Sequence, residues 1–366
     1  MAVMRKFLRR DKLSKDAIRL HQAQYRPSTA RVYNQHWESW KSWCADNGVS
    51  DPMRPLPGEI ANHLAHLSTT LNLTAATLKA RRAALSSVFA ARGNTTITLD
   101  PRISAVIKGA ANVNHKERVL TPKWDLAVVL NFLKSKNMKV NKMLDLKHLT
   151  FKTVFLIALA SGRRASEITN LSGIKGDIST TSKGALCLKF LPEFLAKNQN
   201  PDDISPHILI PPLSAVVDHK SEDLALCPVR ALKEYRARTE RFRAPSQRAL
   251  FMSLNLNHSK DITRATLSRW LKTTIKSAYI SLDKKGEPSQ PAHTLLAEAR
   301  AHEIRAWAAT LAAKSTPMSQ VMRAAYWRSS TVFVRHYLRD IALTSENGTH
   351  SLPALVAAQT PIAARK

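Results

Sequence analysis

The chain has 366 residues and a formal net charge of +29, with 56 lysines and arginines against 27 aspartates and glutamates. Hydrophobic residues make up 44% of it, an ordinary fraction for a globular protein, so long disordered stretches are not expected. A cationic surplus of this size opposes compaction unless a polyanion offsets it, and it indicates nucleic acid or an anionic membrane as the partner. The length allows two or three domains.

Several classes of protein are excluded by what the sequence lacks. It has no run of about 18 apolar residues, the length that spans a membrane, and its basic start MAVMRKFLRRDKLSK lacks the apolar core of a secretory signal. None of its glycines forms a phosphate-binding or dinucleotide loop. Cys44, Cys187 and Cys227 lie far apart, without the spacing of a disulfide framework or a zinc site. We therefore expect a soluble intracellular protein, nuclear in a eukaryotic cell, that uses no metal, nucleotide or other cofactor.

The first third of the chain predicts a flexible arm followed by a small helical bundle. Residues 1–24 are polar and basic and show no long periodic pattern, which predicts the arm. Apolar residues then recur at helical spacing over residues 25–112: first Tyr33, Trp37, Trp40 and Cys44; next Ile60, Leu64, Leu67 and Leu71; then Leu78, Leu85 and Phe89; and finally a short helix over 102–111. Cations on the outer face of the third helix are the candidates for binding DNA: Lys79, Arg81, Arg82 and Arg92.

The remainder predicts a larger domain with both helices and a hairpin. The polar segment 113–123 reads as the linker, residues 124–345 as the domain, and residues 346–366 as a tail. Short apolar runs over 185–212, separated by polar residues, predict a β-hairpin with a long polar tip. Helical patterns cover residues 124–133, 150–161, 229–238, 262–277, 295–313, 318–323 and 331–343.

The segment SGRRASEI places two arginines where one apolar helix ends and the next begins. Ser161-Gly162 breaks the first helix, and Arg163, Arg164 and Glu167 follow. An arginine suits a phosphodiester because its planar guanidinium donates to two phosphate oxygens and stays charged at any working pH. A solvated arginine pair at a helix start explains the segment equally well. The choice between the two interpretations therefore depends on residues further along the chain.

A second group of candidates lies near the C-terminus. His302 and Arg305 are three residues apart in HEIRAWAATLA and therefore share a helix face. Tyr337 follows in VRHYLRD among further cations. Cutting a phosphodiester without metal requires cations aimed at the transition state, a nucleophile, and an acid for the leaving 5′ oxygen. A phenol with an ordinary pKa near 10 attacks only if its proton is removed or its oxyanion is stabilised, which cationic neighbours achieve.

Arginine, histidine, arginine, tryptophan and tyrosine in this order resemble the active site of tyrosine recombinases. The corresponding residues are Arg164, His302, Arg305, Trp327 and Tyr337. The resemblance covers nearly the whole chain. The segments FLAKNQ, HEIRAWAATLA and STVFVRHYLRD are most similar to recombinases of eukaryotic mobile elements of the DIRS and Crypton kinds. These enzymes cut DNA with a tyrosine, hold the broken strand as a 3′-phosphotyrosine and rejoin it without metal.

The resemblance implies a mainly α-helical fold with a small antiparallel sheet. It implies an N-terminal helical bundle of the SAM-like core-binding type and an α+β catalytic domain of the DNA breaking-rejoining type, which together clamp double-stranded DNA as a homo-tetramer on two sites. Arg164 and Arg305 would hold the phosphate, His302 would assist proton transfer, and Tyr337 would attack. Lys197, on the tip of the hairpin, would be the general acid, Trp327 would donate its indole N–H to the phosphate, and Glu167 would orient an arginine or histidine.

Some alternatives stay open at this point. The gap from Trp327 to Tyr337 is ten residues, one more than is common in the family, so Arg328 competes for the position of Trp327. Lys183 competes with Lys197 as the hairpin lysine. For the whole protein, the alternatives are a type IB topoisomerase and a domesticated DNA-binding protein that no longer cuts DNA.

Overall fold

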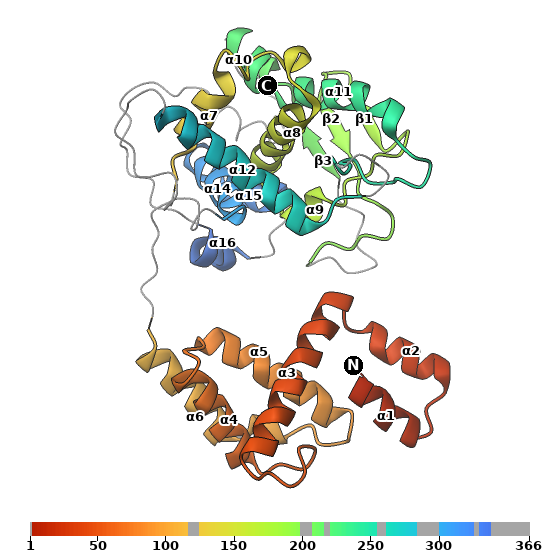
Figure 1. Cartoon of the computed structure of the whole chain (residues 1–366), viewed down its shortest axis with the longest axis vertical. Coiled ribbons are helices and arrows are strands. Elements are labelled where there is room, and N and C mark those ends of the chain that lie inside the picture. Colours follow the sequence, from red (N-terminus) through yellow and green to blue (C-terminus); the bar gives the residue numbers. More distant parts are fainter. Residues whose placement is uncertain are drawn as a thin grey trace. The chain divides into compact units, whose positions relative to one another are not determined.

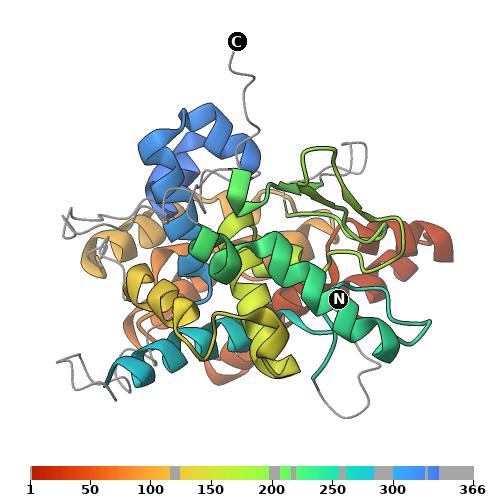
Figure 2. The same cartoon turned by 90° about the horizontal axis from the view of Figure 1, so that it is seen from above.

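A computed structural model describes residues 2–115, 124–197, 207–215, 220–254, 261–283, 300–325 and 329–337. The chain divides into two compact units, Met1–Arg118 and Val119–Lys366 (Figures 1 and 2), and each is considered by itself. Most of the expected linker over 113–123 and all of the expected tail over 346–366 lie outside the described residues. No helix in the described part of the chain is long and apolar enough to cross a membrane.

The first unit contains the bundle that the periodicity predicts. Its four main helices are α3 (Pro27–Asp46), α4 (Pro57–Thr69), α5 (Ala75–Ala90) and α6 (Pro101–Val113), with a 3₁₀ turn η1 (Ile97–Leu99) before the last. Three of them begin with proline, which fits the first helical turn because that position needs no N–H partner. The residues predicted to line the bundle core are buried, with two exceptions: Tyr33 is partly buried, and Leu71 is 55% exposed because α4 ends at Thr69.

The N-terminal segment is not the flexible arm that its polarity predicts. It forms two helices, α1 (Ala2–Arg10) and α2 (Lys15–Ala23), in which Met4, Leu8 and Ile18 are buried. Met4 belongs to the same hydrophobic core cluster as Trp37 and Leu85 of the bundle. The prediction was wrong because apolar residues scattered among many cations are a weak periodic signal, whereas burial of Met4, Leu8 and Ile18 is enough to stabilise two short helices beside an existing core.

The second unit is built around one buried helix, α8 (Leu146–Ser161). Its sequence is apolar all round, which predicts burial on every side, and each residue from Leu149 to Ser161 is buried. It packs against α11, α12, α14 and the strand β3. The other elements are α7 (Leu126–Lys134), η2 (Asn141–Met143), α9 (Ala165–Ile168), η3 (Leu213–Ala215), α10 (Lys220–Leu226), α11 (Pro228–Thr239), η4 (Glu240–Phe242), α12 (Arg264–Asp283), α14 (His302–Ser315), α15 (Met318–Ala324) and α16 (Ser330–His336).

The sheet of this unit has three short antiparallel strands in the order β1-β2-β3. They are β1 (Ile178–Thr180), β2 (Leu186–Leu188) and β3 (Ile208–Ile210), with Leu186 opposite Ile210 and Leu188 opposite Ile208. These four apolar residues are buried, whereas the residues between them are more exposed, as expected for a strand pair with one face on the core. The predicted hairpin is therefore confirmed, and β1 is an addition that its polar sequence IST did not indicate.

The fold class expected from the sequence, mainly α-helical with a small antiparallel sheet, is confirmed. In Figures 1 and 2 the green strands and the blue helices α14 to α16 lie apart from one another within the second unit.

Two of the three cysteines, Cys44 and Cys227, are buried and Cys187 is partly buried. Burial raises the pKa of Cys44 to about 12, so that thiol is inert at neutral pH.

Candidate active site

The turn between α8 and α9 presents the first two candidate residues. Gly162 ends α8 with a φ of 56°, the left-handed conformation that glycine adopts without strain. Arg164 is the residue that precedes α9, and Glu167 lies in the first turn of that helix. Glu167 accepts hydrogen bonds from the backbone N–H of Arg164 at 3.1 Å and from its guanidinium Nη1 at 2.7 Å. One carboxylate thus fixes both the backbone and the side chain of Arg164.

Both arginines of this turn lie inside the protein, and the carboxylate does as well. Glu167 is fully buried, the side chain of Arg164 is 14% exposed, and Arg163 is 6% exposed. The alternative of a solvated arginine pair at a helix start is therefore wrong. Burying charges is costly unless they are paired or have another purpose, so this turn is a candidate site on structural grounds as well.

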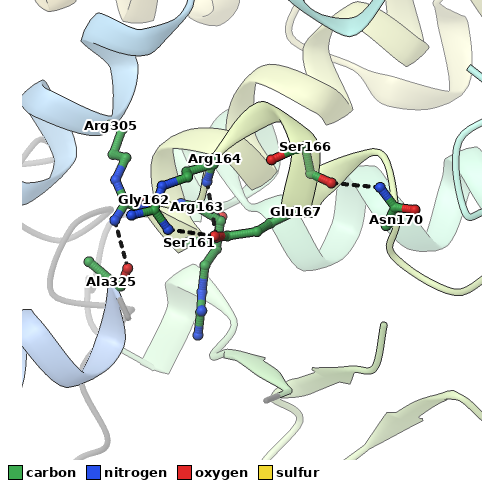
Figure 3. A network of polar contacts seen from close by, with 9 residues as sticks. All are labelled: Ser161, Gly162, Arg163, Arg164, Ser166, Glu167, Asn170, Arg305 and Ala325. Carbon is green, nitrogen blue, oxygen red and sulfur yellow. Dashed lines mark hydrogen bonds and ion pairs between the residues drawn. The ribbon is translucent and has the colours of Figure 1, made fainter. Parts of the chain in front are cut away.

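Arg305 of α14 connects this turn with the C-terminal helices. It is 2% exposed, and its guanidinium donates from Nη1 to the carbonyl of Gly162 at 2.6 Å and from Nη2 to the carbonyl of Ala325 at 2.8 Å (Figure 3). Alanines follow it along α14, in the run RAWAATLAA, and these small side chains suit a helix that packs tightly against its neighbours. Arg305 consequently holds the α8–α9 turn and the end of α15 together.

Tyr337 lies against His302 and Arg305. Its ring centroid is 5.2 Å from the guanidinium carbon of Arg305 and 4.9 Å from the centroid of the His302 ring. The tyrosine is 6% exposed, and its carbonyl accepts a hydrogen bond from the Thr310 hydroxyl at 3.2 Å. The three-residue spacing on α14 places His302 and Arg305 against the same ring, as a shared helix face predicts.

The electrostatics of the cluster favour an anion. Burial, followed by the charges of Arg164 and Arg163, lowers the pKa of Arg305, whereas Glu167 and Tyr337 raise it, and together they leave it at about 10. Arg305 still carries its charge at neutral pH. Because the two other arginines are near enough to act on it and Glu167 neutralises only one charge, the positive charge of the group exceeds the negative. A phosphate would relieve this repulsion.

Neither candidate lysine of the hairpin is joined to this cluster. Lys197 is exposed in the β2–β3 connection, and Lys183 is exposed in the turn between β1 and β2. In the described part of the chain, no hydrogen bond or ring contact links either lysine to Arg305 or Tyr337. Trp327 and its competitor Arg328 lie outside the described residues, so the choice between them stays a prediction.

Of the four cations predicted to bind DNA from the third bundle helix, Lys79, Arg81 and Arg82 lie on α5, whereas Arg92 follows its last residue, Ala90. Lys79 is exposed. Arg82 donates to the Ser104 hydroxyl at 3.1 Å. Arg92 lies over the ring of Phe7, with 5.8 Å between its guanidinium carbon and the ring centroid, and 3.9 Å from a carboxylate oxygen of Asp51. Arg81 is partly buried, which lowers the pKa of its guanidinium. Three of the four are thus engaged or partly enclosed within their own unit.

Two residues of the site were not identified from the sequence in the roles they have. Thr310 fixes the backbone of Tyr337 from α14, and Arg163 lies buried beside the cluster although the motif treats its position as variable. A threonine in an alanine-rich, buried helix is the signal that identifies Thr310, because a buried hydroxyl needs a hydrogen-bond partner. No local signal distinguishes Arg163 from an exposed arginine.

Within the described residues, no group of three histidines, cysteines or carboxylates is arranged to hold a metal ion. No protein-family model and no curated protein matches the sequence. Among solved structures, the lambda integrase dimer bound to a COC′ core site is 15% identical with a TM-score of 0.51, and the match covers 90% of this chain and 77% of that one. The chain shares the fold of lambda integrase. A shorter lambda integrase chain bound to the same core site is 16% identical with a TM-score of 0.50, covering 90% of this chain and 96% of its own.

Proposed function

We propose that the protein is a site-specific DNA recombinase of the tyrosine recombinase kind, which cuts and rejoins DNA through a 3′-phosphotyrosine at Tyr337. The observation that carries the proposal is the contact of one tyrosine with both His302 and Arg305, where Arg305 is bonded to the turn that presents Arg164. These residues come from three separate segments of the chain. Their convergence is what a phosphate-cleaving site needs and what a solvated helix face does not produce.

The chemistry assigns one step to each group. The Tyr337 oxygen attacks phosphorus, the bond from phosphorus to the 5′ oxygen breaks, and the strand remains joined to the tyrosine through its 3′ phosphate. The phenolic proton leaves with the help of His302, and the 5′ oxygen takes a proton from Lys197. Trp327 donates its indole N–H to a phosphate oxygen. Rejoining is the reverse reaction, with a 5′ hydroxyl as the nucleophile, and it needs no external energy source.

The two arginines of the site have different parts in this mechanism. Arg164 is oriented by Glu167 and keeps one side toward solvent, so it is the residue that grips the phosphate oxygens. Both Nη groups of Arg305 donate to backbone carbonyls in the structure. Arg305 therefore acts through its positive charge and by holding the α8–α9 turn, and it is available to phosphate when Tyr337 moves from its guanidinium toward the DNA.

The partner in this proposal is double-stranded DNA. The surplus of 56 cations over 27 acidic residues supports it, and lambda integrase was solved as a dimer bound to a DNA core site. By the resemblance of the sequence, the protein acts as a homo-tetramer on two sites and belongs with the recombinases of DIRS- or Crypton-type mobile elements, where it would integrate or excise the element. The reaction uses no metal or cofactor.

The test is trapping of the covalent intermediate. A nicked duplex that releases a short 5′-hydroxyl fragment after cleavage cannot be rejoined, so a protein–DNA adduct should accumulate on sites selected from a random pool. Tyr337→Phe deletes only the hydroxyl and keeps the ring against Arg305, so DNA binding should persist while the adduct disappears. Peptide mapping should place the DNA on Tyr337.

Each of the other outcomes would assign the protein a different nucleophile or a different function. An adduct that survives in Tyr337→Phe, or that maps to Tyr326, overturns the assignment of the nucleophile. Binding without any adduct on a selected site identifies a DNA-binding protein that no longer cuts. Relaxation of supercoiled DNA without strand exchange between two sites identifies a type IB topoisomerase.

A further inference from the structure

The N-terminal hairpin, helices α1 and α2 over residues 2–23, presents a dense cationic surface. Residues 1–26 contain eight lysines and arginines and only two acidic residues, Asp11 and Asp16. All eight cations are exposed: Arg5, Lys6, Arg9, Arg10, Lys12, Lys15, Arg19 and Arg26. Arg5 bonds to Gln22 and Arg19 pairs with Asp16, and such contacts between exposed side chains are weak.

The hairpin is anchored on the bundle through its apolar face. Met4 and Leu8, one helical turn apart on α1, are 3% and 5% exposed, and Ile18 of α2 is 6% exposed. Phe7 adds a contact to the segment that follows α5, because the Arg92 guanidinium lies over its ring. The cations of α1 fall on the opposite face of the helix from Met4 and Leu8. Burial of one face thus orients the charged face toward solvent.

The connection between the two helices is also well defined. Lys12 adopts a left-handed conformation with a φ of 59°, its N–H donates to the carbonyl of Arg9, and the N–H of Leu13 donates to the carbonyl of Leu8. This is a Schellman helix end. Ser14 then caps α2 through a hydrogen bond from the N–H of Ala17. The cations therefore lie on two fixed helices and not on a loose chain.

The surface suits one kind of polyanion. An amphipathic helix binds a lipid surface by inserting its apolar face, but here Met4 already belongs to the bundle core and Leu8 is buried. What remains outside is mostly positive charge, with Leu13 and Leu20 as the large apolar side chains that are exposed on the described hairpin. The phosphate backbone of a duplex requires only the charge. Three of the four cations predicted to bind DNA, Arg81, Arg82 and Arg92, are engaged or partly enclosed in their unit, so the hairpin offers more exposed charge than they do.

We propose that the N-terminal hairpin is a docking surface for the phosphate backbone of duplex DNA, and that it adds affinity without reading base sequence. The proposal rests on the proposed function only for the choice of duplex DNA as the polyanion. Lys6, Arg9, Arg10 and Lys15 are its main contacts, because they are exposed and the structure gives them no ion-pair partner among the described residues.

The test compares two full-length variants with equal loss of charge. The first carries Lys6→Gln, Arg9→Gln, Arg10→Gln and Lys15→Gln. The second carries Lys136→Gln, Lys142→Gln, Lys175→Gln and Lys233→Gln, four exposed lysines of the other unit. Binding to a random-sequence duplex is measured by fluorescence anisotropy over a range of salt concentrations. The slope of log K against log salt should fall by about 3 to 4 in the hairpin variant, since each phosphate contact contributes about 0.9, and by less than half as much in the control.

A third variant preserves charge by exchanging residue types, with Lys6→Arg, Arg9→Lys, Arg10→Lys and Lys15→Arg, and it should keep the wild-type slope. The fluorescence of the bundle tryptophans reports whether each variant is folded. An unchanged slope in the folded hairpin variant overturns the inference, and so does an equal fall in the control. Loss of binding to vesicles of phosphatidylserine and phosphatidylcholine, with DNA binding intact, would identify a membrane surface instead and also overturn it.

The covalent adduct separates this inference from the proposed function. At low salt and saturating protein, the hairpin variant should form the adduct with the same yield as wild type. If the slope of log K against log salt falls in the hairpin variant as expected, but even the wild-type protein forms no adduct, the docking surface is supported and the recombinase proposal fails. If wild type forms the adduct and the hairpin variant keeps its slope, the recombinase proposal stands and the docking surface does not.

Discussion

Arg305 and Lys152 are the most deeply buried cations in the described part of the second unit, and only Arg305 belongs to the candidate site. Arg305 is 2% exposed and donates to the carbonyls of Gly162 and Ala325. Lys152, on α8, is fully buried, and its Nζ donates to the carbonyls of Met138 at 2.6 Å and Lys139 at 3.1 Å. Both bind backbone oxygens near α8, so hydrogen bonding alone does not distinguish them.

The neighbours distinguish them. The pKa of Arg305 is lowered by burial first and then by the charges of Arg164 and Arg163, so other ionisable side chains surround it. Burial alone lowers the pKa of Lys152, to about 8. A buried charge is therefore a sign of function only where further chemical groups converge on it. At Lys152 the charge ties the 138–139 turn to α8, which is a structural role.

The largest effect is expected from removing either arginine of the site. Arg164→Ala and Arg305→Ala should each lower the rate of adduct formation at least about a hundredfold, the scale for losing one preorganised donor. Binding to duplex DNA should change much less, because many other cations hold the phosphates. Single-turnover cleavage of the nicked duplex measures the first quantity, and anisotropy at the same salt concentration measures the second.

The Arg305 variant requires a control for folding. Its side chain satisfies two buried carbonyls, so truncation leaves them without donors and destabilises the α8–α9 turn. Arg305→Lys retains the charge but lacks the planar guanidinium fork that reaches both carbonyls, so it should recover part of the rate. A wild-type rate in either folded alanine variant would mean that the cluster around Tyr337 is not where the phosphate binds.

A smaller effect, with a specific chemical rescue, is expected at Lys197. This lysine is exposed, in contrast to Lys152, and it is the proposed acid for the leaving 5′ oxygen. Lys197→Ala should slow cleavage of ordinary DNA by about 10² to 10⁴, the range for general acid catalysis. A substrate with sulfur in place of the bridging 5′ oxygen should restore the rate, because a thiolate leaves without a proton. Lys183→Ala is the matched control, and rescue in that variant alone would transfer the role to Lys183.

Much of the architecture is encoded locally and could be predicted. The spacing of Trp37, Trp40 and Cys44 predicts a helix, and the apolar run of α8 predicts a buried helix. The short apolar runs around Leu186 and Ile208 predict a pair of strands. These succeed because the apolar period is strong and a core is available for each face. The prediction failed for residues 2–23 because these two short helices depend on packing for their stability and show only a weak apolar periodicity of their own.

The sequence predicts the candidate site as a set of residues but not its geometry. The order of Arg164, His302, Arg305 and Tyr337 along the chain resembles that of tyrosine recombinases, and the structure brings His302 and Arg305 to the same tyrosine. The bond from Arg305 to Gly162 spans 143 positions in the sequence, and no local rule predicts it. Arg81 and Arg92 show the converse: their helical positions suggested an outer face, and tertiary packing enclosed or engaged them.

The last prediction concerns Lys152, where no change in cleavage is expected. The pKa of Lys152 is about 8 in the folded protein against 10.5 normally. Between these two values the unfolded chain binds a proton that the folded chain has released, so the stability of the folded protein rises as the pH increases from about 8 to 10.5. The contribution is on the order of 3 kcal/mol by the pKa difference. Lys152→Met removes it, so urea unfolding at pH 7 and pH 10 should show a smaller rise in stability than wild type. An identical rise in both proteins, or a loss of cleavage in a folded Lys152→Met at neutral pH, would contradict the structural role and remove the distinction between Lys152 and Arg305.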